Sequence, residues 1–183
     1  MNYNKNDDFL KEENRDGYIV SPLMKKVWSV ELDLLSELDR VCKKYDIKYY
    51  AAFGTLLGAV RNKGFIPWDD DIDVCMLRDD YARLKEVAKD EFSGKYYYQD
   101  WYNSCGRTWI FSKLRNSETT AIEYPDKPEE FNQGIFIDIF PIEEFNDGVN
   151  SNLEFKVVQR ELFNCINLSL IHISEPTRRS YIS

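Results

Sequence analysis

Two short apolar segments that carry isolated aspartates constrain the fold of this chain most. Residues 71–77 read DIDVCML, and residues 134–142 read GIFIDIFPI. β-Branched and aromatic residues dominate both segments, which predicts strands. Alternate side chains of a strand share one face, so Asp71 and Asp73 should point the same way while the apolar residues between them point into the core. The sequence therefore predicts a sheet that buries one face and presents carboxylates from the other.

The rest of the chain alternates between helical and strand patterns. Asp46 is expected to stop the first helix, Thr55 to cap a short second one, and Pro141 to end the last strand. Such mixing favours an α/β or α+β fold, with helices packed on a mixed sheet. We expect helices over 21–45, 55–64, 79–92 and 151–167, and strands over 47–53, 71–77, 95–102, 108–124 with a turn near Asn116, and 134–140.

Three parts are expected along the chain. Residues 1–20 are highly charged with little periodicity, which predicts a flexible lead-in. Residues 21–167 form the expected catalytic domain, incomplete at its C-terminus. Residues 168–183 begin LSLIHISEPTR, which resembles the translation of an adapter used in sequencing libraries, so we expect a non-native tail. An ordinary C-terminal tail is the alternative, and the chain's only histidine, His172, falls in this segment.

The charge and cysteine pattern excludes several classes of function. The net charge of −8 disfavours nucleic-acid binding, which needs a basic face. The 4 cysteines contain no CxxC spacing, so neither a zinc site nor a redox motif is indicated. Without a signal-like start or a membrane-length apolar run, the expected location is the cytoplasm, including the inner face of the membrane as a peripheral site.

Asp71, Asp73 and Asp138 are the candidate metal ligands and catalytic residues. Two carboxylates on one strand face repel each other unless a cation lies between them, and Mg²⁺ or Mn²⁺ is the expected ion. A lone Asp138 in so apolar a strand is explained if it faces the same cation. The alternatives are a solvated turn, which suits Asp69 and Asp70, an EF-hand-like calcium loop, and an exposed edge strand for Asp138.

Gly54 and Thr55 are candidate donor-binding residues. A glycine between a strand and a helix lets the backbone approach a ligand, and a helix N-terminus with a threonine hydroxyl can hold a phosphate. Four basic residues could contact donor phosphates as well, with ordinary surface charge as the alternative. They are Arg61, Lys63, Lys113 and Arg115.

The order Gly-Thr, Asp-x-Asp, then a separate Asp is similar to the signature of the nucleotidyltransferase fold shared with DNA polymerase β. More closely, FGTLLGAVRNKGFIPWDDDIDV, KLRNSET and GIFIDIFPI resemble the LicD family over most of residues 27–142. The gap between Gly54 and Asp71 is longer than usual for the superfamily, and this longer form is itself similar to LicD proteins.

The resemblance implies a transferase that moves a phosphocholine-like group from a CDP-activated donor such as CDP-choline. The implied acceptor is a hydroxyl of a cell-surface glycan: lipopolysaccharide, teichoic acid or capsule. Two alternatives remain open, a small-molecule nucleotidyltransferase of the adenylyltransferase kind and a non-catalytic binding module with a degenerate fold. Identifying which phosphorus atom of the donor is transferred would distinguish the nucleotidyltransferase alternative. Retention of all three carboxylates argues against the non-catalytic module.

Overall fold

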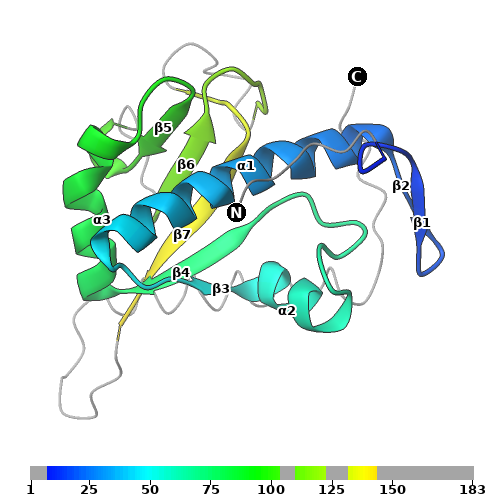
Figure 1. The fold of residues 1–183 in the computed structure, drawn as a ribbon, viewed down its shortest axis with the longest axis horizontal. Helices are drawn as coiled ribbons and strands as arrows, with labels where there is room; N and C mark the ends of the chain where they lie inside the picture. The colour runs from blue at the N-terminus through cyan, green and yellow to red at the C-terminus, as the bar shows by residue number, and fades with distance from the viewer. Residues whose placement is uncertain (1–7, 104–109, 123–131, 144–183) are drawn as a thin grey trace. The chain divides into compact units, whose positions relative to one another are not determined.

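The computed structural model describes residues 8–103, 110–122 and 132–143 (Figure 1). The chain divides into two compact units, Met1–Glu144 and Phe145–Ser183, and every described residue belongs to the first. The expected helix over 151–167 and the expected tail over 168–183 lie outside the described residues.

Helix α1 (Pro22–Tyr45) follows from local sequence signals at both of its ends. The Ser21 hydroxyl accepts a hydrogen bond from the Met24 amide at 3.1 Å, and Pro22 occupies the first turn, where its missing N–H is harmless. Asp46 ends the helix in the left-handed conformation, with φ 51°. The predicted boundaries of this helix are therefore confirmed.

A five-stranded mixed sheet lies beneath α1 (Figure 1). Its order is β3-β4-β7-β6-β5; β4 and β7 run parallel, and the other neighbours run antiparallel. The expected mixed α/β architecture is thus confirmed. The strands are β3 (Tyr50–Ala51), β4 (Asp73–Leu77), β5 (Tyr96–Gln99), β6 (Ser112–Asn116) and β7 (Phe136–Ile142).

Two further helices connect the strands. Helix α2 (Phe53–Arg61) follows β3, and α3 (Arg78–Glu91) follows β4, with a short 3₁₀ turn η1 (Trp101–Asn103) after β5. Helix α3, expected over 79–92, carries Asp79 and Asp80 in its first turn, where the helix dipole favours acidic side chains.

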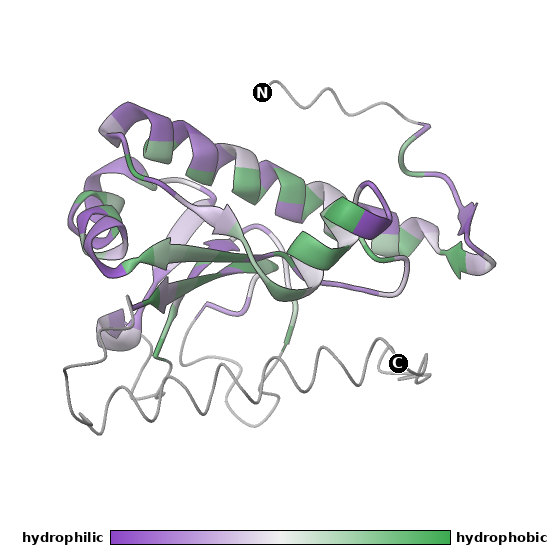
Figure 2. Ribbon diagram, turned by 90° about the horizontal axis from the view of Figure 1, so that it is seen from below, coloured by the Kyte–Doolittle hydropathy of each residue, from purple (hydrophilic) through white to green (hydrophobic). Residues whose placement is uncertain are grey.

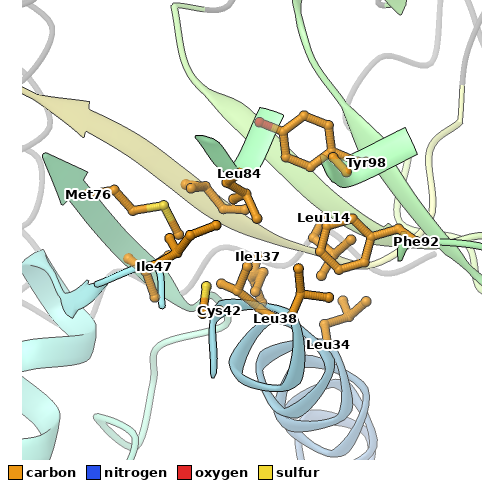
Figure 3. Close-up of a cluster of buried hydrophobic side chains, with 14 of the residues drawn as sticks. Leu34, Leu38, Cys42, Ile47, Met76, Leu84, Phe92, Tyr98, Leu114 and Ile137 are labelled. Carbon is orange, nitrogen blue, oxygen red and sulfur yellow. The ribbon is translucent and has the colours of Figure 1, made fainter. Parts of the chain in front are cut away.

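Helices α1 and α3 cover one face of the sheet (Figure 2). Leu34, Leu38 and Cys42 of α1 point towards Leu114 and Ile137 of the strands (Figure 3). These side chains are at most 1% exposed, so the cluster is a dry core that fixes the sheet against the helices. The opposite face of the sheet carries the polar residues of β4, β6 and β7.

The segment 1–20, expected to be a flexible lead-in, contains a hairpin of β1 (Glu13–Arg15) and β2 (Tyr18–Val20). The Asn14 side chain accepts from the Gly17 amide at 3.0 Å, and Gly17 has φ 86°, which suits a tight turn. Val20 is fully buried, and the Arg15 guanidinium lies 5.3 Å from the centroid of the Trp28 ring. The expectation was wrong for these residues, because a two-residue turn and contacts with α1 replace helical periodicity.

Pro141 lies inside β7, although it was expected to end this strand. The Asp138 amide donates towards β4, to the Ile72 carbonyl at 2.9 Å. The backbone N–H groups of a strand point alternately to its two neighbours, so the backbone nitrogen of Pro141, three residues after Asp138, points towards β6. The pairing with β6 ends at the pair Ser112–Ile139, before Pro141 is reached. The missing N–H of Pro141 therefore costs no ladder hydrogen bond. Strand β3 is also shorter than the expected 47–53, since only Tyr50–Ala51 pairs with β4.

None of the described helices is both long enough and apolar enough to cross a lipid bilayer.

Gly58 allows α2 to pack against the loop that follows it. A Cβ at this position would lie 2.5 Å from the Gly64 carbonyl oxygen and 3.0 Å from the Ile66 amide nitrogen. Because both atoms belong to the backbone, Gly58→Ala should reduce the free energy of unfolding by about 1–3 kcal/mol in urea titrations. Unchanged stability would show that α2 and this loop are less closely packed than the structure indicates.

Candidate functional site

Asp73 and Asp138 lie side by side on the polar face of the sheet. They are register partners in the parallel pair of β4 and β7. Their neighbours Val74 and Ile139 belong to the core, so both aspartates point to the opposite face. Each is 9% exposed, and the charge of Asp138 contributes to raising the pKa of Asp73, after burial and the charge of Asp71.

Asp71 belongs to a loop of three consecutive aspartates that leads into β4. Among the described residues, Asp69, Asp70 and Asp71 form a group in which one carboxylate oxygen from each lies within 4.8 Å of those from the other two. Burial, and then the charge of Asp69, raise the pKa of Asp71 to about 8. The charge of Asp138 acts on Asp71 as well, so the three predicted ligands do form one electrostatic cluster. Asp69 and Asp70, interpreted from sequence as a solvated turn, are part of it.

The N-terminus of α2 is fastened to the same cluster. The Ala52 amide donates to the Asp73 carbonyl at 3.0 Å, and the Thr55 hydroxyl accepts from the Asp73 amide at 2.8 Å. The expectation that Thr55 caps α2 was therefore wrong. The helix begins at Phe53, and its N-cap residue, Ala52, makes no side-chain hydrogen bond. The hydroxyl instead fixes the backbone of the first residue of β4.

Gly54 faces the Asp69 carboxylate. A Cβ on Gly54 would lie 2.4 Å from Asp69 Oδ2, closer than real Cβ atoms approach other atoms. The glycine thus allows a carboxylate to lie at the positive end of α2, where the helix dipole stabilises negative charge. The sequence predicted a donor phosphate at this position, and in the structure the Asp69 side chain lies there.

Lys113 forms an ion pair with one of the carboxylates, that of Asp138. Its Nζ lies 3.0 Å from Asp138 Oδ1 and 3.4 Å from the centroid of the Phe136 ring, and the residue is 3% exposed. Its charge also counteracts the upward pKa shift of Asp73. Arg115, two residues along β6, is fully buried and donates to Gln99 Oε1 and to the Gly134 carbonyl. Both candidate phosphate contacts are therefore already engaged within the protein.

Arg61 and Lys63 lie at the other end of α2 from Gly54. Eight residues of helix separate the two ends by about 12 Å. Both side chains are exposed; Arg61 lies 6.0 Å from the Trp68 ring centroid, and Lys63 Nζ donates to the Val60 carbonyl at 2.9 Å. The predicted donor-binding residues therefore do not lie together: Gly54 and Thr55 adjoin the carboxylate cluster, whereas Arg61 and Lys63 lie at the far end of α2.

Glu31 of α1 is a further carboxyl group that interacts electrostatically with these aspartates, and it was not predicted from the sequence. It is 1% exposed, and its Oε2 has no hydrogen-bond partner among the described residues. Burial, and then the charges of Asp71 and its neighbours in the loop, raise the pKa of Glu31 to about 10. A signal was present in the sequence: Glu31 lies at helical spacing between Trp28 and Leu34, on the buried face of α1.

Trp28 holds the acidic loop from the same face of α1. Its indole N–H donates to the Asp69 carbonyl at 2.7 Å, and its ring stacks on Phe65 with centroids 4.5 Å apart. Residues three apart on a helix share a face, so Trp28 and Glu31 approach the loop together. One helix thus positions the loop backbone and adds a carboxyl group beside it.

This set of oxygen donors fits a divalent cation. Buried carboxylates with raised pKa values repel one another, and hard cations such as Mg²⁺ or Mn²⁺ are bound by such oxygens. An EF-hand loop is excluded, because β4 begins at Asp73, within the span that such a loop would need.

Comparison with known proteins gives the context of this site. A stretch of 56 residues is 54% identical to the lipopolysaccharide cholinephosphotransferase LicD of Haemophilus influenzae, covering 31% of this chain and 21% of that protein. An uncharacterised protein of Rickettsia prowazekii is 32% identical over 149 residues, covering 76% of this chain and 53% of the relative. An uncharacterised protein of Rickettsia typhi is 30% identical over 104 residues, covering 54% of this chain and 33% of that relative.

The chain therefore spans about half or less of the length of these relatives. The family model of the LicD/FKTN/FKRP nucleotidyltransferase domain matches residues 46–168, from the end of α1 through the acidic loop and β7. Since this match covers most of the chain, the chain belongs to the LicD/FKTN/FKRP nucleotidyltransferase-domain family.

Proposed function

We propose that this chain carries the catalytic part of a metal-dependent phosphotransferase with a nucleotidyltransferase fold. It would move a phosphocholine-like group from a CDP-activated donor onto a hydroxyl of a cell-surface glycan. The observation that carries this proposal is the junction of α2 with the carboxylate cluster, through Thr55 and Asp73. Family membership and the name of the Haemophilus influenzae relative support the choice of reaction and acceptor.

Asp71, Asp73 and Asp138 would hold the cation, Mg²⁺ or Mn²⁺. A bound divalent cation neutralises charge on the transferred phosphate and supports in-line displacement. Asp73 and Asp138 lie on one face of the sheet, and each interacts electrostatically with Asp71 in the loop before β4, which supports a shared ion. Lys113, held 3.0 Å from Asp138, adds positive charge beside them.

Asp138 is the proposed general base. An ionised carboxylate can accept the proton of the attacking glycan hydroxyl as the new oxygen–phosphorus bond forms and the bond to CMP breaks. The ion pair with Lys113 places a positive charge 3.0 Å from Oδ1 of Asp138. Lys113 would then position the Asp138 carboxylate through their ion pair, and Lys113 would not need to bind the phosphate directly.

The reaction is tested by incubating the protein with Mn²⁺, a glycan acceptor and CDP-choline labelled either in the choline or in the cytidine. We expect choline label to appear in the acceptor and cytidine label to appear in free CMP. Cytidine label in the acceptor would instead show nucleotidyl transfer. Transfer of neither label, with a protein that binds Mn²⁺ and is folded, would contradict the proposed function of this chain.

A further inference from the structure

The polar face of the sheet carries an aromatic row beside the carboxylates. Phe140 follows Asp138 by two residues on β7, so both side chains share the face opposite the core. Cys75 is the register partner of Phe140 on β4, and Tyr50 is the partner of Cys75 on β3, so these side chains point to the same face. The row of Tyr50, Cys75 and Phe140 therefore runs alongside the pair of Asp73 and Asp138.

Two further phenylalanine rings meet Phe140 in this row. The Phe53 ring lies 5.2 Å from the Phe140 ring, centroid to centroid, and the two ring planes are 88° apart. The Phe111 ring lies 4.5 Å from the Phe140 ring, with the planes 37° apart. Phe53 and Phe111 are partly exposed, whereas Phe140 is 9% exposed. The three rings thus form an aromatic corner, in which the Phe53 ring stands nearly perpendicular to a floor made by Phe140.

The backbone of Phe53 is strained, which the start of a helix does not explain. Its φ of 43° lies in the left-handed region, where a bulky side chain is unfavourable and glycine is preferred. Strained residues persist where the surrounding structure fixes them, and they concentrate at functional sites. Phe53 directly precedes Gly54 and Thr55, which lie against the acidic loop and β4. The strain therefore holds an aromatic ring beside the carboxylate cluster.

Aromatic rings in this position attract a cation. The face of the ring carries negative partial charge, and quaternary ammonium groups bind against such faces. The same face of the sheet already shows a contact of this kind, since Lys113 Nζ lies 3.4 Å from the centroid of the Phe136 ring. Asp73 and Asp138 add acidic groups two residues away along the strands. Both properties favour a large organic cation over a neutral group.

We propose that the aromatic corner of Phe53, Phe111 and Phe140 binds the quaternary ammonium group of the donor. Two residues along a strand span about 7 Å, which separates the carboxylates from the aromatic row. In phosphocholine an ester oxygen and two methylene carbons separate phosphorus from nitrogen, and they span a comparable distance. A phosphate bound at the carboxylates through the cation would thus place its trimethylammonium group at the corner. This inference rests on the proposed function and specifies it, since it names the residues that select the transferred group.

The test compares three phosphate esters that differ only in the head group. They are phosphocholine, phosphoethanolamine and the neutral ester in which a tert-butyl group replaces the trimethylammonium group. Their dissociation constants are measured by NMR titration with saturating Mg²⁺, so no transfer reaction is needed. We expect wild type to bind phosphocholine about tenfold more tightly than either analogue, the size of a desolvated cation–π contact. Phe53→Leu should reduce this preference to about twofold or less, and Phe53→Tyr, which keeps the ring, should retain it.

Tyr102→Leu is the matched control, because it removes a ring that is 81% exposed on η1, outside the aromatic corner. It should keep the wild-type preference. Phe111→Leu covers the case in which Phe53→Leu does not fold, and it should lose the preference as well. Equal affinities of wild type for the three esters would overturn the inference. So would an unchanged preference in folded Phe53→Leu or Phe111→Leu protein, because the rings would then serve packing only.

The transfer assay with CDP-choline separates this inference from the proposed function. Transfer of choline phosphate by a wild-type protein without the head-group preference would contradict only the inference. A preference for phosphocholine that depends on Phe53, without any transfer, would contradict only the proposed function.

Discussion

Asp73→Asn is expected to lower transfer activity about a thousandfold while leaving the metal-free protein at least as stable as wild type. Loss of charge stabilisation worth several kcal/mol in the transition state corresponds to a rate loss of this size. The same carboxylate is unfavourable in the metal-free fold, because burial and the charges of Asp71 and Asp138 raise its pKa. Initial rates with CDP-choline and thermal unfolding in EDTA measure the two effects.

The pH dependence of stability has a definite sign. The folded state binds the protons of Asp71 and Asp73 more tightly than the unfolded state does, since both pKa values are raised, that of Asp71 to about 8. The stabilisation is present in full below about pH 4, where the unfolded aspartates are protonated too. It is lost as pH rises towards 8, so metal-free wild type should melt lower at pH 8 than at pH 5.

Asp73→Asn should reduce this pH dependence, and Mn²⁺ should oppose it in wild type. Asp90→Asn is the matched control, because Asp90 is an exposed aspartate of α3. The control should keep both wild-type activity and the wild-type pH profile. An Asp73→Asn protein with near wild-type turnover would refute the metal role of Asp73.

Gly54→Ala is the second substitution with a large expected effect, and it should separate activity from stability. The new Cβ would lie 2.4 Å from Asp69 Oδ2, so the Asp69 carboxylate must move. A short side chain can move at small cost, and replacing a helical glycine by alanine favours the helix by about 0.5–1 kcal/mol. We therefore expect a free energy of unfolding within about 1 kcal/mol of wild type and a loss of activity of about 100-fold, the size associated with a displacement of about 1 Å at an active site.

Gly58→Ala on the same helix is the comparison for Gly54→Ala. Its Cβ would meet backbone atoms of Gly64 and Ile66, which cannot move without disturbing the loop, so this variant should lose stability. Denaturant titration and initial rates are measured on both proteins. Equal stability losses in the two variants would show that Gly54 serves packing, and full activity in Gly54→Ala would show that the position of Asp69 is unimportant.

Local signals predicted much of the fold. The helical pattern from about Ser21 and the stop at Asp46 predicted α1, because periodicity and helix ends depend on residues that are close in the chain. The alternation of apolar residues with Asp73 and with Asp138 predicted the buried and polar faces of β4 and β7. The hairpin of β1 and β2 was missed, since its stability depends on contacts of Arg15 and Val20 beyond the hairpin.

The sequence by itself indicated the candidate residues for the chemistry, because the order of Gly54, Thr55, Asp71, Asp73 and Asp138 can be recognised without coordinates. Only the tertiary structure decided how these groups meet. The parallel register pairs Asp73 with Asp138, Gly54 faces Asp69 rather than an open helix end, and Lys113 pairs with Asp138.

Glu31 is the clearest case of this division. In the sequence it is one acidic residue in a charged helix, and its spacing from Trp28 and Leu34 does not reveal what it faces. In the structure α1 crosses the loop 69–71 and buries Glu31 beside it. The physical reason is that helical periodicity specifies which face of α1 is buried, whereas the partner of that face is set by contacts about 40 residues away in the chain, as the bond from Trp28 to Asp69 shows.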